Sequence, residues 1–105
     1  MGCEQMMQRM TFLINGDNLW RVNISHDEDG TPVVQIDLHQ MTCKEARKTL
    51  FNIIAMYRFE FKLDVIHGYN HGTAIRDMIR GDFDNQRVVG MIFPYNQGRT
   101  VLEIA

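Results

Sequence analysis

The chain has 105 residues, the size of one domain, which is enough to bury a modest core without disulfides or a structural metal. Hydrophobic residues make up 45% of the composition and charged residues 23%, a balance that excludes a disordered chain. The net charge of -2 lacks the basic surplus that nucleic-acid-binding domains usually carry. However, residues 1–40 hold two basic and six acidic side chains, whereas residues 41–105 hold nine basic and seven acidic ones. A local basic surface therefore remains compatible with the composition.

The cysteine content and the hydrophobic runs indicate the compartment. Two cysteines, Cys3 and Cys43, are too few for a disulfide framework, which favours a reducing environment. The apolar run 10–14 is too short for a membrane span and lacks the features of a signal peptide. We therefore expect a cytoplasmic protein with no membrane partner, and the sequence leaves its oligomeric state open.

Residues 1–32 are interpreted as an N-terminal extension. Residues 1–9 show no clear period and predict a weakly ordered lead-in. Two β-rich runs, 10–14 and 19–24, flank the segment 15–18, which begins Asn-Gly; this arrangement predicts a β-hairpin. Residues 25–32 have the composition of a solvated loop.

Residues 33–105 are interpreted as the main domain, and it begins with a strand and a helix. Val33–Leu38 is rich in β-branched residues, and its alternation places Val34, Ile36 and Leu38 on one face. Thr42 and Glu45 form a capping box, which predicts the start of a helix. The buried side of this helix is predicted from helical spacing to hold Ala46, Leu50, Ile53, Ile54 and Tyr57.

A second strand, a second helix and two further strands follow. Residues 63–67 predict a strand parallel to the first, because a helix connects the two. After the turn-rich loop 68–72, Thr73 is expected to cap a helix that ends near Gly81. Residues 87–93 and 100–104 predict the last two strands. The fold class predicted is α/β: a two-layer, open, mixed four-stranded sheet with two helices in the order β-α-β-α-β-β, preceded by the hairpin.

The residues that suggest chemistry are predicted to meet at one edge of this sheet. Asp37 and His39 share the strand face opposite the apolar one, and His67 ends the second strand. Ligands of open α/β sheets bind beyond the carboxyl ends of the strands. The glycines Gly68 and Gly72 allow backbone amides to approach a ligand, and a helix N-terminus favours a phosphate.

Two motifs at this edge resemble a known family. Ile36-Asp-Leu-His39 resembles the "LDLH" motif of the Smr (small MutS-related) domain family, and the segment 67–76, His-Gly-Tyr-Asn-His-Gly-Thr-Ala-Ile-Arg, resembles its "HGxGxGxLR" segment. The resemblance covers residues 33–105, including the glycine-containing hairpin 96–102. It implies the β-α-β-α-β-β fold, binding of DNA or RNA, and the nicking endonuclease activity of several members.

The resemblance also implies a set of site residues. The candidate catalytic residues are Asp37, His39 and His67. The candidate phosphate-binding residues are Gly68, Gly72, Thr73 and Arg76, and Tyr69 is a candidate for stacking on a base. The sequence departs from the family pattern at Gln40, where a glycine is usual, and in the loop that follows Gly68, which is one residue longer and lacks a lysine.

These residues suggest a mechanism that needs no metal. His39 is suited to act as general base or acid on a phosphodiester, with Asp37 fixing its tautomer and Arg76 stabilising the developing charge. A two-metal nuclease needs several converging carboxylates, and Asp37 is the one that the sequence places. Zinc-type spacing is also absent, so we expect no metal and no cofactor. Cleavage of RNA, whose 2′-OH is an internal nucleophile, is easier to assemble than DNA hydrolysis.

Plainer interpretations stay open. Asp37 and His39 could be a hydrogen-bonded pair that only ties strand to helix. Arg76 and Arg80 lie four residues apart on a helix, where solvated charge is common. The alternative function is therefore a catalytically silent module that docks nucleic acid, for example structured RNA or a ribosome.

Overall fold

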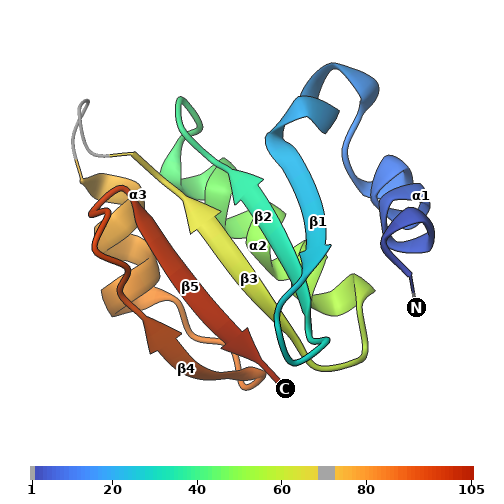
Figure 1. The fold of residues 1–105 in the computed structure, drawn as a ribbon. Helices are drawn as coiled ribbons and strands as arrows, with labels where there is room; N and C mark the ends of the chain where they lie inside the picture. Colours follow the sequence, from blue (N-terminus) through green and yellow to red (C-terminus); the bar gives the residue numbers. More distant parts are fainter. Residues whose placement is uncertain (1, 69–72) are drawn as a thin grey trace.

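A five-stranded mixed sheet forms the centre of the protein (Figure 1). The structure is a computed structural model that describes residues 2–68 and 73–105. The strand order is β1-β2-β3-β5-β4; β2 and β3 run parallel, and the other neighbouring pairs are antiparallel. The strands are β1 (Val22–His26), β2 (Pro32–Asp37), β3 (Phe61–Ile66), β4 (Val88–Ile92) and β5 (Arg99–Ile104).

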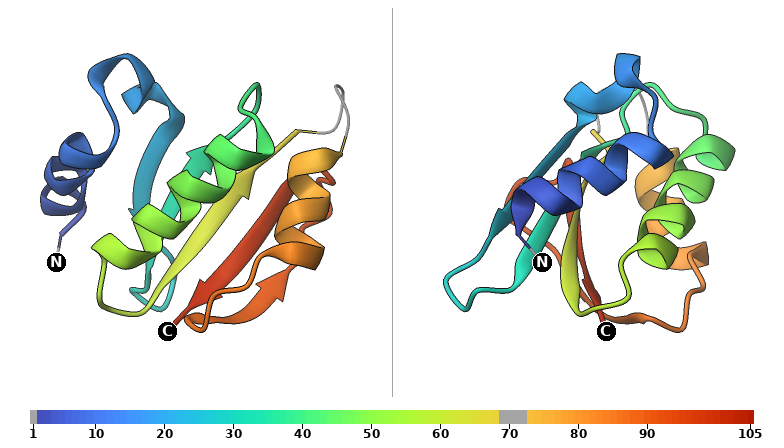
Figure 2. Two further views of the ribbon diagram at one scale, coloured as in Figure 1. Left: turned by 180° about the vertical axis from the view of Figure 1, so that it is seen from behind. Right: turned by 90° about the vertical axis from the view of Figure 1, so that its right-hand side faces the viewer.

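The helices pack on one face of the sheet, which leaves the opposite face, called the open face below, without a helical cover (Figure 2). The helical segments are α1 (Cys3–Leu13), the 3₁₀-helix η1 (Gly16–Arg21), α2 (Cys43–Met56), α3 (Ala74–Asp77) and the π-helical turn η2 (Met78–Asp82), which continues α3. One hydrophobic core lies between the sheet and the helices. In residues 2–68 and 73–105, no helix is long and apolar enough to cross a membrane.

The predictions for the first strand and helix of the main domain are confirmed. Val34, Ile36 and Leu38 are all fully buried. Thr42 accepts a hydrogen bond from the Glu45 backbone, which completes the capping box at the start of α2. The residues predicted for the buried side of this helix are in the core: Ala46, Leu50, Ile53, Ile54 and Tyr57.

The predicted N-terminal hairpin is wrong. Residues 3–13 form a helix, so the lead-in is also an ordered element, and residues 16–21 form a 3₁₀-helix. The Asn15 side chain accepts a hydrogen bond from the Asp17 backbone and caps that helix, whereas a two-residue Asn-Gly hairpin turn needs positive φ at both residues. The hairpin of this region instead joins β1 to β2 through a turn that contains Gly30, whose φ is 82°.

The number of strands in the sheet also differs from the prediction. The sheet has five strands rather than four, because β1 pairs with β2 and extends the sheet. From Pro32 onward the elements follow the order β-α-β-α-β-β. Packing continues across the predicted boundary between residues 32 and 33, because Met6 and Met10 of α1 lie in the common core.

The second helix is short: α3 has four residues before the π-helical turn.

Some strands end and others begin at the same end of the sheet, which is called the carboxyl edge below. It comprises the last residues of β2, β3 and β4 (Asp37, Ile66 and Ile92) and the first residues of β1 and β5 (Val22 and Arg99), because the antiparallel strands enter where the others leave. The connection from η1 to β1, the loop after β2 and the connection from β4 to β5 therefore all reach this edge (Figure 1).

Candidate active site

A carboxylate–imidazole pair lies at the carboxyl edge. Asp37 Oδ1 is 2.5 Å from His39 Nδ1 and also accepts a hydrogen bond of 3.0 Å from the His39 backbone amide. Because an ionised carboxylate only accepts hydrogen bonds, the bonded Nδ1 carries the proton and Nε2 of the neutral ring keeps a lone pair. The His39 side chain is 42% exposed, so this pair can be reached from solvent.

The first motif meets the second at this edge, as the sequence predicts. The Leu38 amide donates to the Ile66 carbonyl at 2.8 Å, which extends the pairing of β2 with β3 beyond Asp37. Gly68 has a φ of 71°, a conformation that favours glycine. A Cβ atom at Gly68 would lie 3.8 Å from His39 Cβ, so this glycine lies directly beside the imidazole-bearing residue.

His67 reaches the same edge but not the same face. The register pairs Asp37 with Ile66, and side chains alternate along a strand, so His67 lies on the helix-covered face with Leu38. His67 is 5% exposed, whereas Asp37 and His39 face away from the core. The two motif histidines therefore share one edge, as predicted, but lie on opposite faces of the sheet.

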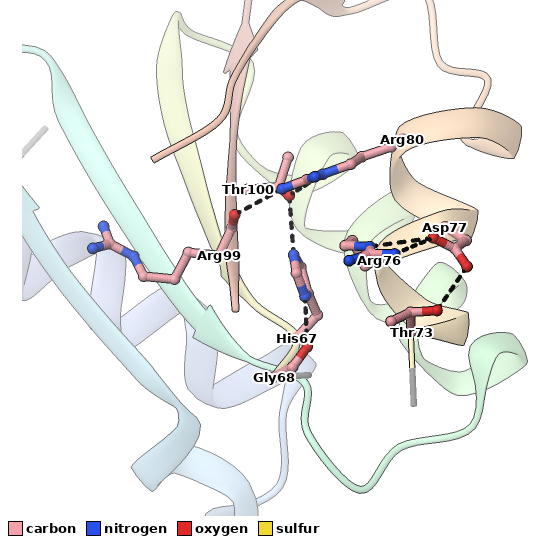
Figure 3. A network of polar contacts seen from close by, with 8 residues as sticks. All are labelled: His67, Gly68, Thr73, Arg76, Asp77, Arg80, Arg99 and Thr100. Carbon is pink, nitrogen blue, oxygen red and sulfur yellow. Dashed lines mark hydrogen bonds and ion pairs between the residues drawn. The ribbon is translucent and has the colours of Figure 1, made fainter. Parts of the chain in front are cut away.

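Both ring nitrogens of His67 have partners (Figure 3). Nδ1 is 2.9 Å from the Gly68 carbonyl, which can only accept, so Nδ1 carries the proton of the neutral ring. Nε2 then accepts from the Thr100 hydroxyl at 3.0 Å, and that hydroxyl accepts from Arg80 Nε at 3.0 Å. Burial, and the charges of Arg80 and Arg76, lower the pKa of His67. His67 is thus a neutral link between β3, β5 and η2.

Arg76 and Thr73 both interact with Asp77 (Figure 3). Arg76 donates from Nε and from one terminal nitrogen to Asp77 Oδ1, at 3.2 and 3.1 Å. The Thr73 hydroxyl donates to Asp77 Oδ2 at 2.9 Å and makes no cap hydrogen bond to the backbone. Thr73 is therefore at the N-cap position of α3, as predicted, but its hydroxyl bonds Asp77 instead of a backbone amide. The Arg76 charge is partly neutralised within the protein.

Two arginines that the site prediction does not include lie at this edge, one on each face of the sheet. Arg99, on the open face, forms a two-pronged ion pair with the buried Asp64, at 3.1 and 2.5 Å. Arg80, on the other face, has its guanidinium carbon 4.5 Å from the centre of the Phe93 ring and donates to the Arg99 carbonyl at 3.3 Å. The i, i+4 spacing of Arg76 and Arg80 was the sequence signal for the second of these arginines.

Trp20 and Arg21, from the N-terminal extension, also contact the pair. One terminal nitrogen of Arg21 donates to the Asp37 and His39 carbonyls, at 3.0 and 2.9 Å, so Arg21 holds the chain where β2 ends. The Trp20 ring meets the His39 ring edge to face, with 5.9 Å between centroids. The sequence gives no signal for these contacts, because its pattern predicts a hairpin strand here, outside the main domain.

The remaining candidates, Tyr69 and Gly72, lie outside the described residues, so the phosphate contact expected there stays a prediction. Within residues 2–68 and 73–105, no group of three or more His, Cys, Asp or Glu side chains is arranged to hold a metal ion.

Comparison of the chain with protein-family models and with curated proteins gives no match. The geometry of the carboxyl edge is therefore the basis for assigning a function.

Proposed function

We propose that the protein is an Smr-type nucleic-acid-binding domain that cleaves an RNA phosphodiester at its carboxyl edge. The observation that carries the proposal is the Asp37–His39 pair, in which a solvent-accessible imidazole is oriented by a carboxylate 2.5 Å away. A structural pair inside a core would not need an exposed ring. Orientation of histidine by a carboxylate is instead a common arrangement for proton transfer.

The chemistry follows from the tautomer of His39. Nε2 takes the proton of the ribose 2′-OH, and the 2′ oxygen attacks the adjacent phosphorus. The bond from phosphorus to the 5′ oxygen breaks, a 2′,3′-cyclic phosphate forms, and the departing 5′ oxygen receives a proton from the protonated imidazole or from water. Asp37 stabilises the imidazolium that exists between the two proton transfers.

In this proposal, the positive charge that contacts the phosphate belongs to Arg99 on the open face. Asp37 pairs with Ile66, which pairs with Arg99, so Asp37 and Arg99 lie in one row across the sheet. The usual spacing of strands puts their Cα atoms about 10 Å apart. Arg99 keeps 35% of its side chain exposed while Asp64 holds it in place. Arg99 lies on the same face of the sheet as Asp37, whereas Arg76 belongs to α3 on the helix-covered face, so Arg99 fits a phosphate contact beside His39 better than Arg76.

A cleavage assay tests the proposal. Purified protein is incubated with single-stranded RNA and with supercoiled DNA, with and without a chelator. We expect cleavage of RNA that the chelator does not abolish, ending in a cyclic phosphate. His39→Ala should lower the rate by roughly a hundred- to ten-thousand-fold with little change in RNA affinity, because it removes a proton-transfer group.

The matched control is His26→Ala. His26 pairs with Pro32 at the opposite end of the sheet, so this variant should cut at the wild-type rate. Equal cutting by wild type and His39→Ala would show that the activity lies elsewhere. Binding without any cleavage would favour the alternative, a module that docks RNA or a ribosome, for which the exposed aromatic rings of Phe93 and Tyr95 near the same edge are suited.

A further inference from the structure

Trp20 is an exposed aromatic residue in an unusual position. The residue is 60% exposed, although indole is among the side chains that gain most from burial. It is also the one tryptophan of the sequence. Its ring lies beside His39, at an interplanar angle of 64°, so it extends the surface of the proposed catalytic pair.

The neighbouring residue fixes Trp20 in place. The Arg21 guanidinium carbon lies 4.6 Å from the centre of the Trp20 ring, and Arg21 also bonds the Asn18 side chain and the carbonyls that flank Leu38. An arginine that is bonded to the backbone at two points is a rigid support. Trp20 is therefore held against Arg21 and His39 while much of its ring surface stays in solvent.

We propose that Trp20 stacks on an unpaired base of single-stranded nucleic acid and so positions the adjacent phosphate at His39. This inference rests on the nucleic-acid binding of the proposed function and adds that the bound nucleic acid is single-stranded. Stacking of bases on aromatic side chains beside basic residues is the usual way in which proteins hold single strands. Bases in a duplex are stacked on each other and are not available to Trp20.

The location argues for this occupant over a protein partner. An exposed tryptophan beside an arginine also fits a protein interface. Here, however, the ring lies next to a solvent-accessible carboxylate–imidazole pair. Asp37 of that pair lies in one row with Arg99 across the open face. A polyanion with flat bases complements this combination of aromatic surface, imidazole and guanidinium.

The test compares the affinity of wild type, Trp20→Phe and Trp20→Ala for an RNA oligonucleotide, for single-stranded DNA of the same sequence, and for the duplex. Trp20→Ala should weaken binding of the RNA roughly five- to a hundredfold, and Trp20→Phe should keep most of the affinity. Duplex binding should be equal in all three proteins. In the wild type, RNA should quench tryptophan fluorescence, which reports on Trp20 alone.

An RNA with an abasic position at the stacking site provides the ligand-side control. It should bind wild type as weakly as intact RNA binds Trp20→Ala, and the variant should lose nothing further. The slope of log K against log salt should be the same in wild type and Trp20→Ala, because no phosphate contact is removed. As a protein control, Phe12→Ala changes a residue of α1 that is 91% exposed and should bind as wild type does.

The outcomes separate the two proposals. If RNA binds wild type without changing its tryptophan fluorescence and binds Trp20→Ala equally well, the stacking role is wrong and the proposed function stands. A flatter salt slope in Trp20→Ala would also count against stacking, because it would mean that the variant acts through Arg21. Failure of wild type to bind single strands at all would overturn both. Equal effects on RNA and DNA would extend the substrate class to single strands of either kind.

Discussion

Gln40 has a backbone conformation that is unusual for a residue with a side chain. Its φ is 71°, in the left-handed region, and its side chain is exposed. It follows His39 directly. The chain must turn here to leave β2 and enter α2, and the Arg21 bond to the His39 carbonyl fixes that turn. The strain therefore lies directly after the strand that leads to the Asp37–His39 pair.

Gln40→Gly should raise the free energy of unfolding by about 1 kcal/mol. A left-handed conformation costs a non-glycine residue about 1–3 kcal/mol, and the entropy that glycine gains in the unfolded chain offsets only about 0.5–1 kcal/mol of this. Gln40→Ala keeps the Cβ atom and should leave stability unchanged. Urea unfolding of the three proteins measures the difference. Equal stabilisation by alanine would show that the side chain, not the backbone, is unfavourable here.

At the scale of elements, α1 is tied to the domain by both apolar and polar contacts. Met6 and Met10 are fully buried in the common core. The Tyr57 hydroxyl donates to the Met6 carbonyl at 2.5 Å, and burial raises the pKa of Tyr57 to about 12. Arg9 donates to the Met56 carbonyl at the end of α2, at 2.9 Å. The N-terminal helix is therefore a structural part of the domain.

Met10→Ala should lower the free energy of unfolding by about 2–5 kcal/mol, because it removes a buried side chain and leaves a cavity. Gln8→Ala changes an exposed position of the same helix and should alter stability by no more than about 0.5 kcal/mol. Chemical denaturation followed by circular dichroism gives both values. A small effect of Met10→Ala would mean that α1 unfolds separately from the sheet.

Local signals determined how much of the fold could be predicted. The capping box of Thr42 and the alternation of Val34, Ile36 and Leu38 depend on neighbouring residues, so the sequence identified β2 and α2. Asn15-Gly16 misled the prediction, because the same dipeptide that forms hairpin turns here starts a 3₁₀-helix. Nothing in the local sequence distinguishes those two uses.

In the candidate site, too, only the features that depend on neighbouring residues could be predicted. Asp37 and His39 share a face because side chains alternate along a strand, and this is visible in the sequence. The separation of His67 from them depends on the register between β2 and β3, which the sequence did not give. Trp20 and Arg21 approach His39 only because β1 pairs with β2, a contact that the mistaken hairpin excluded.

At the scale of the whole molecule, His67 links elements that are far apart in the sequence. Through Thr100 and Arg80 it connects the ends of β3, β5 and η2, all of which separate when the domain unfolds. Its ring stays neutral in the folded protein, since burial and the nearby arginines lower its pKa. In the unfolded chain its pKa returns to about 6.5. His67 should therefore add a pH-dependent term to the free energy of unfolding of the whole domain.

The sign follows from proton binding. Above about pH 6.5 the His67 ring is neutral in both states, and its contribution to stability is complete. As the pH falls below that value, the unfolded chain binds a proton that the folded protein excludes, so the free energy of unfolding decreases. The slope that this group adds is at most about 1.4 kcal/mol per pH unit, and it ends below the lowered pKa of the folded state.

Urea unfolding between pH 5 and 7.5 measures this slope. His67→Gln is expected to be less stable at all pH values. Below about pH 6.5, its free energy of unfolding should change less steeply with pH than that of wild type, by an amount equivalent to the uptake of up to one proton on unfolding. Gln8→Ala, which removes no titrating group, should keep the wild-type slope. The slope is the informative quantity, because a merely structural loss at His67 would shift the curve downward without flattening it. Parallel curves for wild type and His67→Gln would show that the ring accepts its proton in the folded protein.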